Sequence, residues 1–92
     1  MRLDLFLWYA RLTKTRSAAQ ALATTGHLRL DGRAIDRAHC PVRIGSILTY
    51  AQGQRVRVIR VEALPHRRGP APEAQACYQD LAANVSQQAP AD

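Results

Sequence analysis

The chain has 92 residues, a formal net charge of +6 and a sequence pI near 10.4. A chain of this length forms one domain with a modest core, which disfavours a deep active site, and its excess of positive charge favours a polyanionic partner. All thirteen basic residues lie at or before Arg68, together with four acidic ones, so this part carries +9 and the remainder −3. The sequence therefore predicts a binding surface in the first two-thirds of the chain.

Two short amphipathic helices are predicted at the start of the chain. The apolar residues of the first recur at helical spacing, at Leu3, Phe6, Leu7 and Ala10. The second helix has start signals in Thr15 and Ser17 and ends at Gly26. Trp8 lies on a second apolar stripe of the first helix, and packing under a C-terminal helix is the favoured role for it over stacking on a base.

A cluster of cations marks the joint between these helices. Arg11, Lys14 and Arg16, called the basic corner below, surround the joint, and Arg2 is expected near it. Guanidinium and ammonium groups bind phosphate oxygens, so these residues are the predicted primary phosphate contacts; an ordinary solvated face is the alternative. Ser17 and Gln20 are candidates for bonds to RNA backbone or 2′-hydroxyl groups. For Ser17, helix capping is an equal explanation.

After Gly26 the pattern changes from helical to alternating. Residues 27–30 read as a strand followed by a tight turn at Asp31-Gly32, and residues 33–42 read as irregular because Pro41 breaks any strand. Arg29 and Arg33 flank the turn and extend the positive surface, although solubility of the sheet explains them nearly as well.

Two further strands are predicted over 47–50 and 55–61. In the second of them, Val56 and Val58 are expected to face inward and Arg55 and Arg57 outward. The alternation breaks at Ile59, which indicates a bulge or cover on both faces.

The last part of the chain is predicted to hold a linker over 63–71, a helix over 72–85 packed on the domain and a disordered tail over 86–92. Pro72 and Glu73 suit a first helical turn. The linker carries Arg67 and Arg68, which offer a secondary RNA contact.

Catalysis and metal binding are not predicted. His39, Cys40 and Cys77 lack the paired spacing of a zinc site, and the three histidines fall on unrelated elements. Two cysteines do not make a disulfide framework, there is no signal-peptide pattern, and the apolar run over 5–10 is shorter than the roughly 20 residues that cross a bilayer. We expect a cytoplasmic protein that is not an enzyme and uses no cofactor, metal or membrane.

The order of these features is similar to the RNA-binding domain named after ribosomal small-subunit protein four. The matching positions run from Arg2 to about Tyr50 and are Arg2-Leu3-Asp4, Ala10-Arg11-Leu12, Lys14-Thr15-Arg16-Ser17, Ala21-Leu22, Gly26, Leu28, Leu30, Gly32, Val42 and Gly45. The chain most resembles the ribosome-associated heat-shock protein fifteen branch, through Phe6-Leu7-Trp8, Arg67-Arg68, Pro72-Glu73-Ala74 and Tyr78. This resemblance covers residues 1 to about 85.

The resemblance implies a small α+β fold in which two N-terminal helices pack on a short, mostly antiparallel sheet (the αL motif), followed by a C-terminal helix. Residues 1–62 would form the RNA-binding domain, which presents both helices and an adjoining strand to structured RNA. The resemblance and the predictions for individual residues together give the following set of RNA-binding residues: Arg2, Arg11, Lys14, Thr15, Arg16, Ser17, Gln20, Arg29, Asp31, Gly32 and Arg33.

The branch is known for binding large ribosomal subunits that carry a stalled nascent chain on tRNA, and a similar protein in other bacteria assists ribosome quality control. The resemblance thus implies binding to ribosomal RNA of the large subunit, and to peptidyl-tRNA, in the heat-shock response or in rescue and recycling of stalled ribosomes. We expect the protein to be a monomer. Four departures stand out. Asp31 replaces the usual asparagine, Ser46 replaces the usual aspartate, fewer lysines surround Lys14, and the long basic C-terminal extension is missing.

Two other classes stay open at this point. A protein-interaction adaptor would use Trp8 and the C-terminal helix to bind a partner protein. A duplex-DNA binder of helix-turn-helix type ranks lower, because the second helix offers few long side chains for reading bases.

Overall fold

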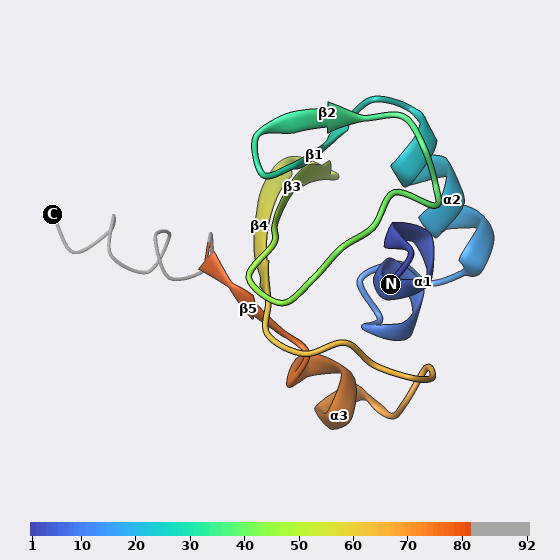
Figure 1. The fold of residues 1–92 in the computed structure, drawn as a ribbon, viewed down its shortest axis with the longest axis vertical. Helices are drawn as coiled ribbons and strands as arrows, with labels where there is room; N and C mark the ends of the chain where they lie inside the picture. The colour runs from blue at the N-terminus through green and yellow to red at the C-terminus, as the bar shows by residue number, and fades with distance from the viewer. Residues whose placement is uncertain (82–92) are drawn as a thin grey trace, which may run out of the picture.

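The computed structural model describes residues 1–81, which form three helices and one five-stranded sheet. The elements are α1 (Leu3–Tyr9), α2 (Arg16–Thr24), β1 (Leu28–Leu30), β2 (Arg33–Ile35), β3 (Ile47–Gln52), β4 (Arg55–Val61), α3 (Ala71–Gln75) and β5 (Tyr78–Asp80). The strand order is β2-β1-β3-β4-β5, and every neighbouring pair is antiparallel (Figure 1). The predicted α+β class, with two N-terminal helices on an antiparallel sheet, is confirmed.

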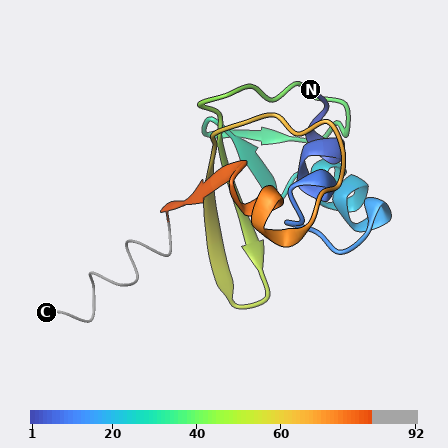
Figure 2. The same ribbon diagram turned by 90° about the horizontal axis from the view of Figure 1, so that it is seen from below.

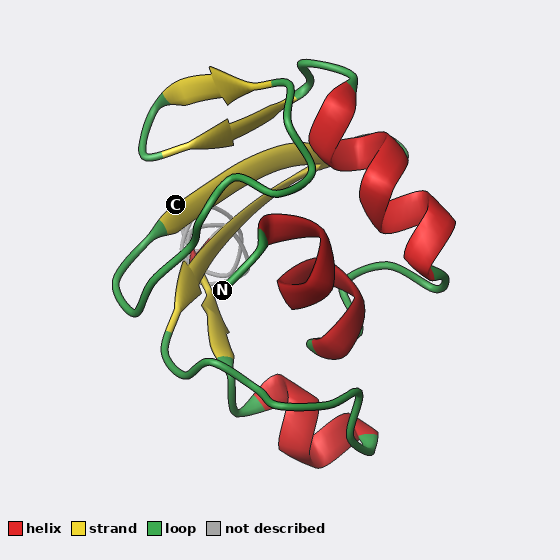
Figure 3. Cartoon of the chain, turned by 45° about the vertical axis from the view of Figure 1, so that its right-hand side comes forward, coloured by secondary structure: helices red, strands yellow, loops and turns green. Residues whose placement is uncertain are grey.

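The helices lie along the concave side of the curved sheet (Figure 3). Fully buried side chains fill the space between them: Leu3, Phe6 and Leu7 from α1, Ala19 and Ala23 from α2, and Leu28, Leu48, Ile59 and Val61 from the sheet. Each large apolar side chain contributes roughly 1.5–3 kcal/mol by leaving water. This core fixes where α1 ends and α2 begins, and thereby positions the loop that carries the basic corner.

The two N-terminal helices begin and end for local reasons. The Thr15 hydroxyl oxygen accepts a hydrogen bond from the N–H of Ala18 at 3.0 Å, so Thr15 is the N-cap of α2. Ser17 lies inside the helix, and the capping role considered for it is wrong. The chain leaves α2 through Gly26, whose φ of +80° favours glycine.

The strands β1 and β2 form a hairpin with a two-residue turn. The sequence had predicted the turn but irregular structure after it. Asp31 and Gly32 have φ values of +52° and +86°, the backbone of a two-residue hairpin turn. This turn sends the chain back as β2, with Leu30 paired to Arg33. The expectation of irregular structure directly after the turn is therefore wrong. The turn geometry imposes strand pairing over three residues, Arg33–Ile35, and this strand ends before the chain reaches Pro41.

The prediction for the faces of β4 is also wrong. Residues 47–52 of β3 pair with residues 55–60 of β4 without interruption, so there is no bulge at Ile59. Ile59 and Val61 are fully buried, whereas Val56 is 59% exposed. Side chains alternate along a strand, so Arg57 shares the inner face with Ile59. The β3–β4 hairpin extends past the helices (Figure 2), and its far end therefore has no apolar cover to fix the faces expected from its valines.

The C-terminal segment differs from the predicted helix over 72–85. The helix α3 covers only Ala71–Gln75, and the chain then forms β5 along the edge of β4, with Val61 paired to Tyr78. The carbonyl of Cys77 accepts from the N–H groups of Glu62 and Ala63, at 2.8 and 3.2 Å. Without β5, the N–H and C=O groups along the edge of β4 would lack hydrogen-bond partners. Pairing of these groups outweighs the helical spacing of the apolar residues in this segment. Residues 82–85 of the predicted helix and the predicted tail over 86–92 lie outside the described residues, and the division of the chain at 62 and 71 stays a prediction.

Candidate nucleic-acid interface

The basic corner comprises two residues of the short loop between α1 and α2, Arg11 and Lys14, and the first residue of α2, Arg16. The loop is held against α1 because the N–H groups of Leu12 and Thr13 both donate to the carbonyl of Leu7, at 2.9 and 3.2 Å. Arg11 takes a positive φ of +59° there, which reverses the chain direction. The loop is therefore fixed by backbone hydrogen bonds before any ligand binds.

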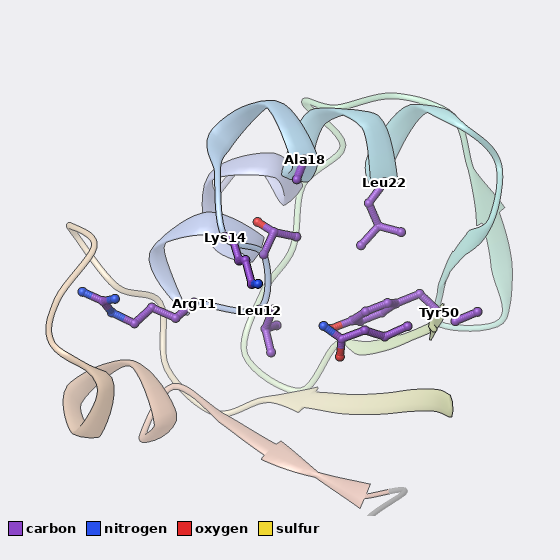
Figure 4. Close-up of a pocket in the computed structure, with 9 residues that line it drawn as sticks. Arg11, Leu12, Lys14, Ala18, Leu22 and Tyr50 are labelled. Carbon is purple, nitrogen blue, oxygen red and sulfur yellow. The ribbon is translucent and has the colours of Figure 1, made fainter. Parts of the chain in front are cut away.

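The three cations of the corner keep their charge available. Between residues 1–81 four salt bridges form, and none of them uses Arg11, Lys14 or Arg16. All three residues are exposed. Arg11 points toward the linker after β4, where its Nε donates to the carbonyl of Gly69 at 2.6 Å, and Lys14 points away from it (Figure 4). The remaining guanidinium N–H groups of Arg11 form no hydrogen bond within residues 1–81 and can meet a phosphate.

Arg2 has a structural partner. Its Nε and Nη2 donate to the two carboxylate oxygens of Asp4, at 3.0 and 2.9 Å. Asp4 is completely buried and also accepts from the N–H of Leu5. Part of the positive charge of Arg2 is thus compensated within the first turn of α1, and its RNA contact stays a prediction.

The exposed face of α2 continues the surface from the corner. Arg16, Ser17 and Gln20 are all exposed there. The Thr15 side chain differs, because its hydroxyl oxygen is used in capping α2. Ser17 and Gln20 are accessible for hydrogen bonding, and their contact with RNA stays a prediction.

The turn between β1 and β2 carries the second group of candidates. The N–H of Ile47 donates to the Asp31 carboxylate at 2.9 Å, and Arg29 Nη1 donates to the carbonyl of Gly32 at 3.3 Å. Arg29 and Arg33 are exposed. Figures 1 and 2 place this turn on the opposite side of the molecule from the α1–α2 loop. The structure therefore separates the predicted residues into two groups and does not bring them into one continuous site.

Arg67 and Arg68 both have partners within the chain. Arg67 forms an exposed salt bridge with Glu73 at 3.0 Å. Arg68 Nε donates to the carbonyl of Trp8 at 3.2 Å, and its guanidinium carbon lies 5.8 Å from the centre of the Trp8 ring. A cation at the C-terminal end of α1 is favoured by the helix dipole. Trp8 thus packs against the linker, whereas the sequence placed it under the C-terminal helix.

A groove beside the basic corner was missed by the sequence analysis. It has a volume of about 430 Å³ and is lined by residues 11–14 of the loop, Ala18 and Leu22 of α2, and residues 50–52 of β3 (Figure 4). No local pattern links these segments, because only the folded sheet brings the end of β3 next to the loop.

Tyr50 lies at the floor of this groove and is almost fully buried. Its hydroxyl has no hydrogen-bond partner among the described residues. Burial raises the pKa of Tyr50 to about 12, although the positive charge of Arg57 acts in the opposite direction. Arg57 in turn forms a salt bridge with Asp80 of β5 at 3.1 Å.

Two kinds of site are not found in the described residues. Residues 1–81 hold no cluster of three or more histidine, cysteine or acidic side chains suited to a metal ion. No helix in this part of the chain combines the length and hydropathy needed to span a bilayer.

The segment that carries the helix pair and the basic corner matches a known family. Residues 1–48 match the S4 domain. Over 85 residues, or 92% of the chain, the sequence is 36% identical to the heat shock protein 15 homolog of Haemophilus influenzae and 34% identical to heat shock protein 15 of Escherichia coli K12. This chain belongs to the S4-domain family, in its heat shock protein 15 branch. The resemblance seen in the sequence is confirmed.

The relatives of this S4-domain protein are longer than the chain itself. The chain spans 64% of the Haemophilus protein and 63% of the Escherichia protein. A trimeric structure of Vibrio cholerae heat shock protein 15 has the same fold, with a TM-score of 0.85 and 34% identity over 96% of this chain and 88% of that one. The small ribosomal subunit protein uS4 of Phytoplasma mali is 32% identical over 66 residues, 72% of this chain and 33% of that protein.

Proposed function

We propose that the protein binds structured ribosomal RNA on the large ribosomal subunit, with the basic corner as its principal contact. The observation that carries the proposal is the exposure of Lys14, in the loop between two packed helices, and of Arg16, at the start of α2. Neither residue takes part in the four salt bridges formed within residues 1–81. Family membership supplies the class of ligand. A fixed loop loses little conformational entropy on binding, so little of the favourable interaction energy between its cations and the phosphates is offset by ordering the loop.

Affinity comes mainly from charge. Lysine and arginine neutralise phosphates and release condensed counterions, while the deep, narrow groove of an A-form helix hides the base edges from side chains. Specificity then comes from the shape of the RNA. The separate group at the β1–β2 turn, Arg29 and Arg33, provides a second contact only to an RNA large enough to reach both sides of the molecule.

The finer role follows the heat shock protein 15 branch. We propose that the protein acts in the cytoplasm, as a monomer without cofactor or catalytic activity. It binds large subunits that carry a stalled chain on peptidyl-tRNA and serves the heat-shock response or ribosome rescue, recycling and quality control. The adaptor alternative has less support, because Trp8 packs against Arg68 and α3 has only five residues.

The test is a salt titration of binding to purified large and small ribosomal subunits. Three phosphate contacts at the corner predict that log affinity falls with log salt at a slope of roughly −2 to −3. Large subunits with peptidyl-tRNA should bind more tightly than empty ones, and small subunits weakly. A flat salt response would contradict phosphate-led binding. Equal affinity for large and small subunits would contradict the assignment to the large subunit.

A further inference from the structure

The groove beside the basic corner has the composition of a nucleobase site. Its volume of about 430 Å³ falls within the roughly 300–1,000 Å³ typical of small-ligand sites. Leu12, Leu22 and Tyr50 form an apolar floor, and Lys14 stands at its rim, whereas Arg11 lines one end of the groove and directs its guanidinium toward the linker (Figure 4). None of its lining residues is acidic. An apolar floor next to the Lys14 ammonium group complements a flat base attached to an anionic phosphate.

Gln52 supplies a fixed polar group at the same groove. Its side-chain oxygen accepts from Arg57 Nη1 at 2.8 Å, which leaves the NH₂ group as a donor. Carbonyl oxygens and ring nitrogens of bases are acceptors of such a bond. In a paired RNA helix these groups are occupied, whereas unpaired bases in loops and bulges expose their faces and edges.

We propose that this groove accepts one unstacked base of the bound RNA, while Lys14 contacts a phosphate next to it. The inference rests on the proposed RNA binding and adds a selection for RNA with an extruded nucleotide. It assigns recognition to Leu12, Leu22, Tyr50 and Gln52, none of which the sequence marked as an RNA contact.

The experiment compares three RNA hairpins: a fully paired one, the same hairpin with a single-nucleotide bulge, and the bulged hairpin with an abasic site at the bulge. Burying one base is expected to favour the bulged hairpin by about tenfold, within the range of about 1–3 kcal/mol known for stacked bases. The abasic hairpin keeps the kink and the phosphates but lacks the base, and it should bind like the paired one.

Two leucine substitutions on α2 provide the protein arm. Ala18 is exposed and lines the groove, so Ala18→Leu fills the groove without changing charge or helix propensity greatly. It should abolish the preference for the bulged hairpin and leave binding to the paired hairpin. Ala21→Leu adds the same side chain at an exposed position of α2 that does not line the groove, and should keep the preference. As a second test of the groove, Gln52→Ala should weaken the preference several-fold.

The outcomes separate the two proposals. If the wild-type protein binds all three hairpins equally, the base site is wrong and RNA binding stands. A preference that survives at the abasic bulge, or in Ala18→Leu, also overturns the base site. If no hairpin binds even at low salt, the proposed function itself fails.

Discussion

The guanidinium of Arg2 donates two hydrogen bonds to the carboxylate of Asp4, which is completely buried at the start of α1. Asp4 Oδ1 also accepts a hydrogen bond from the N–H of Leu5. The carboxylate therefore satisfies one of the backbone N–H groups that have no partner within the first turn of the helix. Arg2 is 46% exposed, which leaves one side of the guanidinium in contact with solvent. A residue predicted as an RNA contact is thus first a component of the fold.

Removing Arg2 should cost stability. Arg2→Ala leaves the Asp4 carboxylate buried without its charged partner, and we expect the free energy of unfolding to fall by about 2 kcal/mol, less than for a fully buried pair because Arg2 is half exposed. Urea unfolding measures this. Arg37→Ala, at an exposed position, should change the same quantity by less than about 0.5 kcal/mol. An unchanged urea midpoint in Arg2→Ala would show that the ion pair is unimportant.

Asp31→Asn should keep the fold and improve RNA binding. An asparagine adopts the positive φ of +52° and its side-chain oxygen accepts from Ile47 as the aspartate does, so stability should change by less than about 0.5 kcal/mol. Loss of a negative charge between Arg29 and Arg33 should raise affinity for ribosomal RNA a few-fold at low salt. Asp31→Ala, which loses the hydrogen bond, should be destabilised by about 1–2 kcal/mol. Unchanged RNA binding by Asp31→Asn at low salt would place this turn outside the interface.

Arg68 should stabilise the contact between the linker and α1. Arg68→Ala removes the hydrogen bond to the Trp8 carbonyl and the cation over the indole, and should lower the free energy of unfolding by about 1 kcal/mol. Trp8 is the single tryptophan, so its fluorescence reports the same contact and should shift toward that of an exposed indole. Arg67→Ala breaks only an exposed pair and should leave both signals nearly unchanged. Identical behaviour of the two variants would contradict a specific role for Arg68.

The raised pKa of Tyr50 makes stability depend on alkaline pH. Burial raises this pKa from 10.0 to about 12, so between these values the unfolded chain loses the proton while the folded chain keeps it. Stability is therefore fully present below pH 10 and falls as the pH rises toward 12. The free energy of unfolding of Tyr50→Phe minus that of wild type should therefore be larger at a pH of about 11 than at a pH of about 8, by roughly 1 kcal/mol. Guanidinium-chloride unfolding at both pH values gives this difference, and a difference of zero would contradict the burial of an unpaired hydroxyl.

Local signals were sufficient for the two N-terminal helices and the turn after β1. The spacing of Leu3, Phe6 and Leu7 predicted a helix with one buried face, and all three are fully buried. The turn at Asp31-Gly32 was evident from the two residue types that tolerate positive φ. The exposure of Lys14 and Arg16 likewise follows from their place in a short loop and a first helical turn.

Non-local contacts decided what the sequence did not predict. The segment over 78–80 has helical spacing of its apolar residues, but the open edge of β4 pairs with it as β5. The buried face of β4 is set by the core at Ile59 and Val61, not by the valines near its start. Tyr50, Arg57 and the groove beside the corner come together only when β3 and β4 lie next to the α1–α2 loop. No spacing along the chain encodes that proximity.

The central claim is that the basic corner holds ribosomal RNA, and reversal of its charge tests it most directly. A protein with Lys14→Glu and Arg16→Glu should bind large ribosomal subunits at least about 100-fold more weakly, because two phosphate contacts become repulsive. Its circular-dichroism spectrum should be unchanged, since both side chains are exposed and glutamate suits the first turn of α2. Arg37→Glu with Arg55→Glu changes the net charge equally at exposed positions outside the corner and should bind far better than the corner variant. Equal binding by wild type and the folded corner variant would contradict the claim.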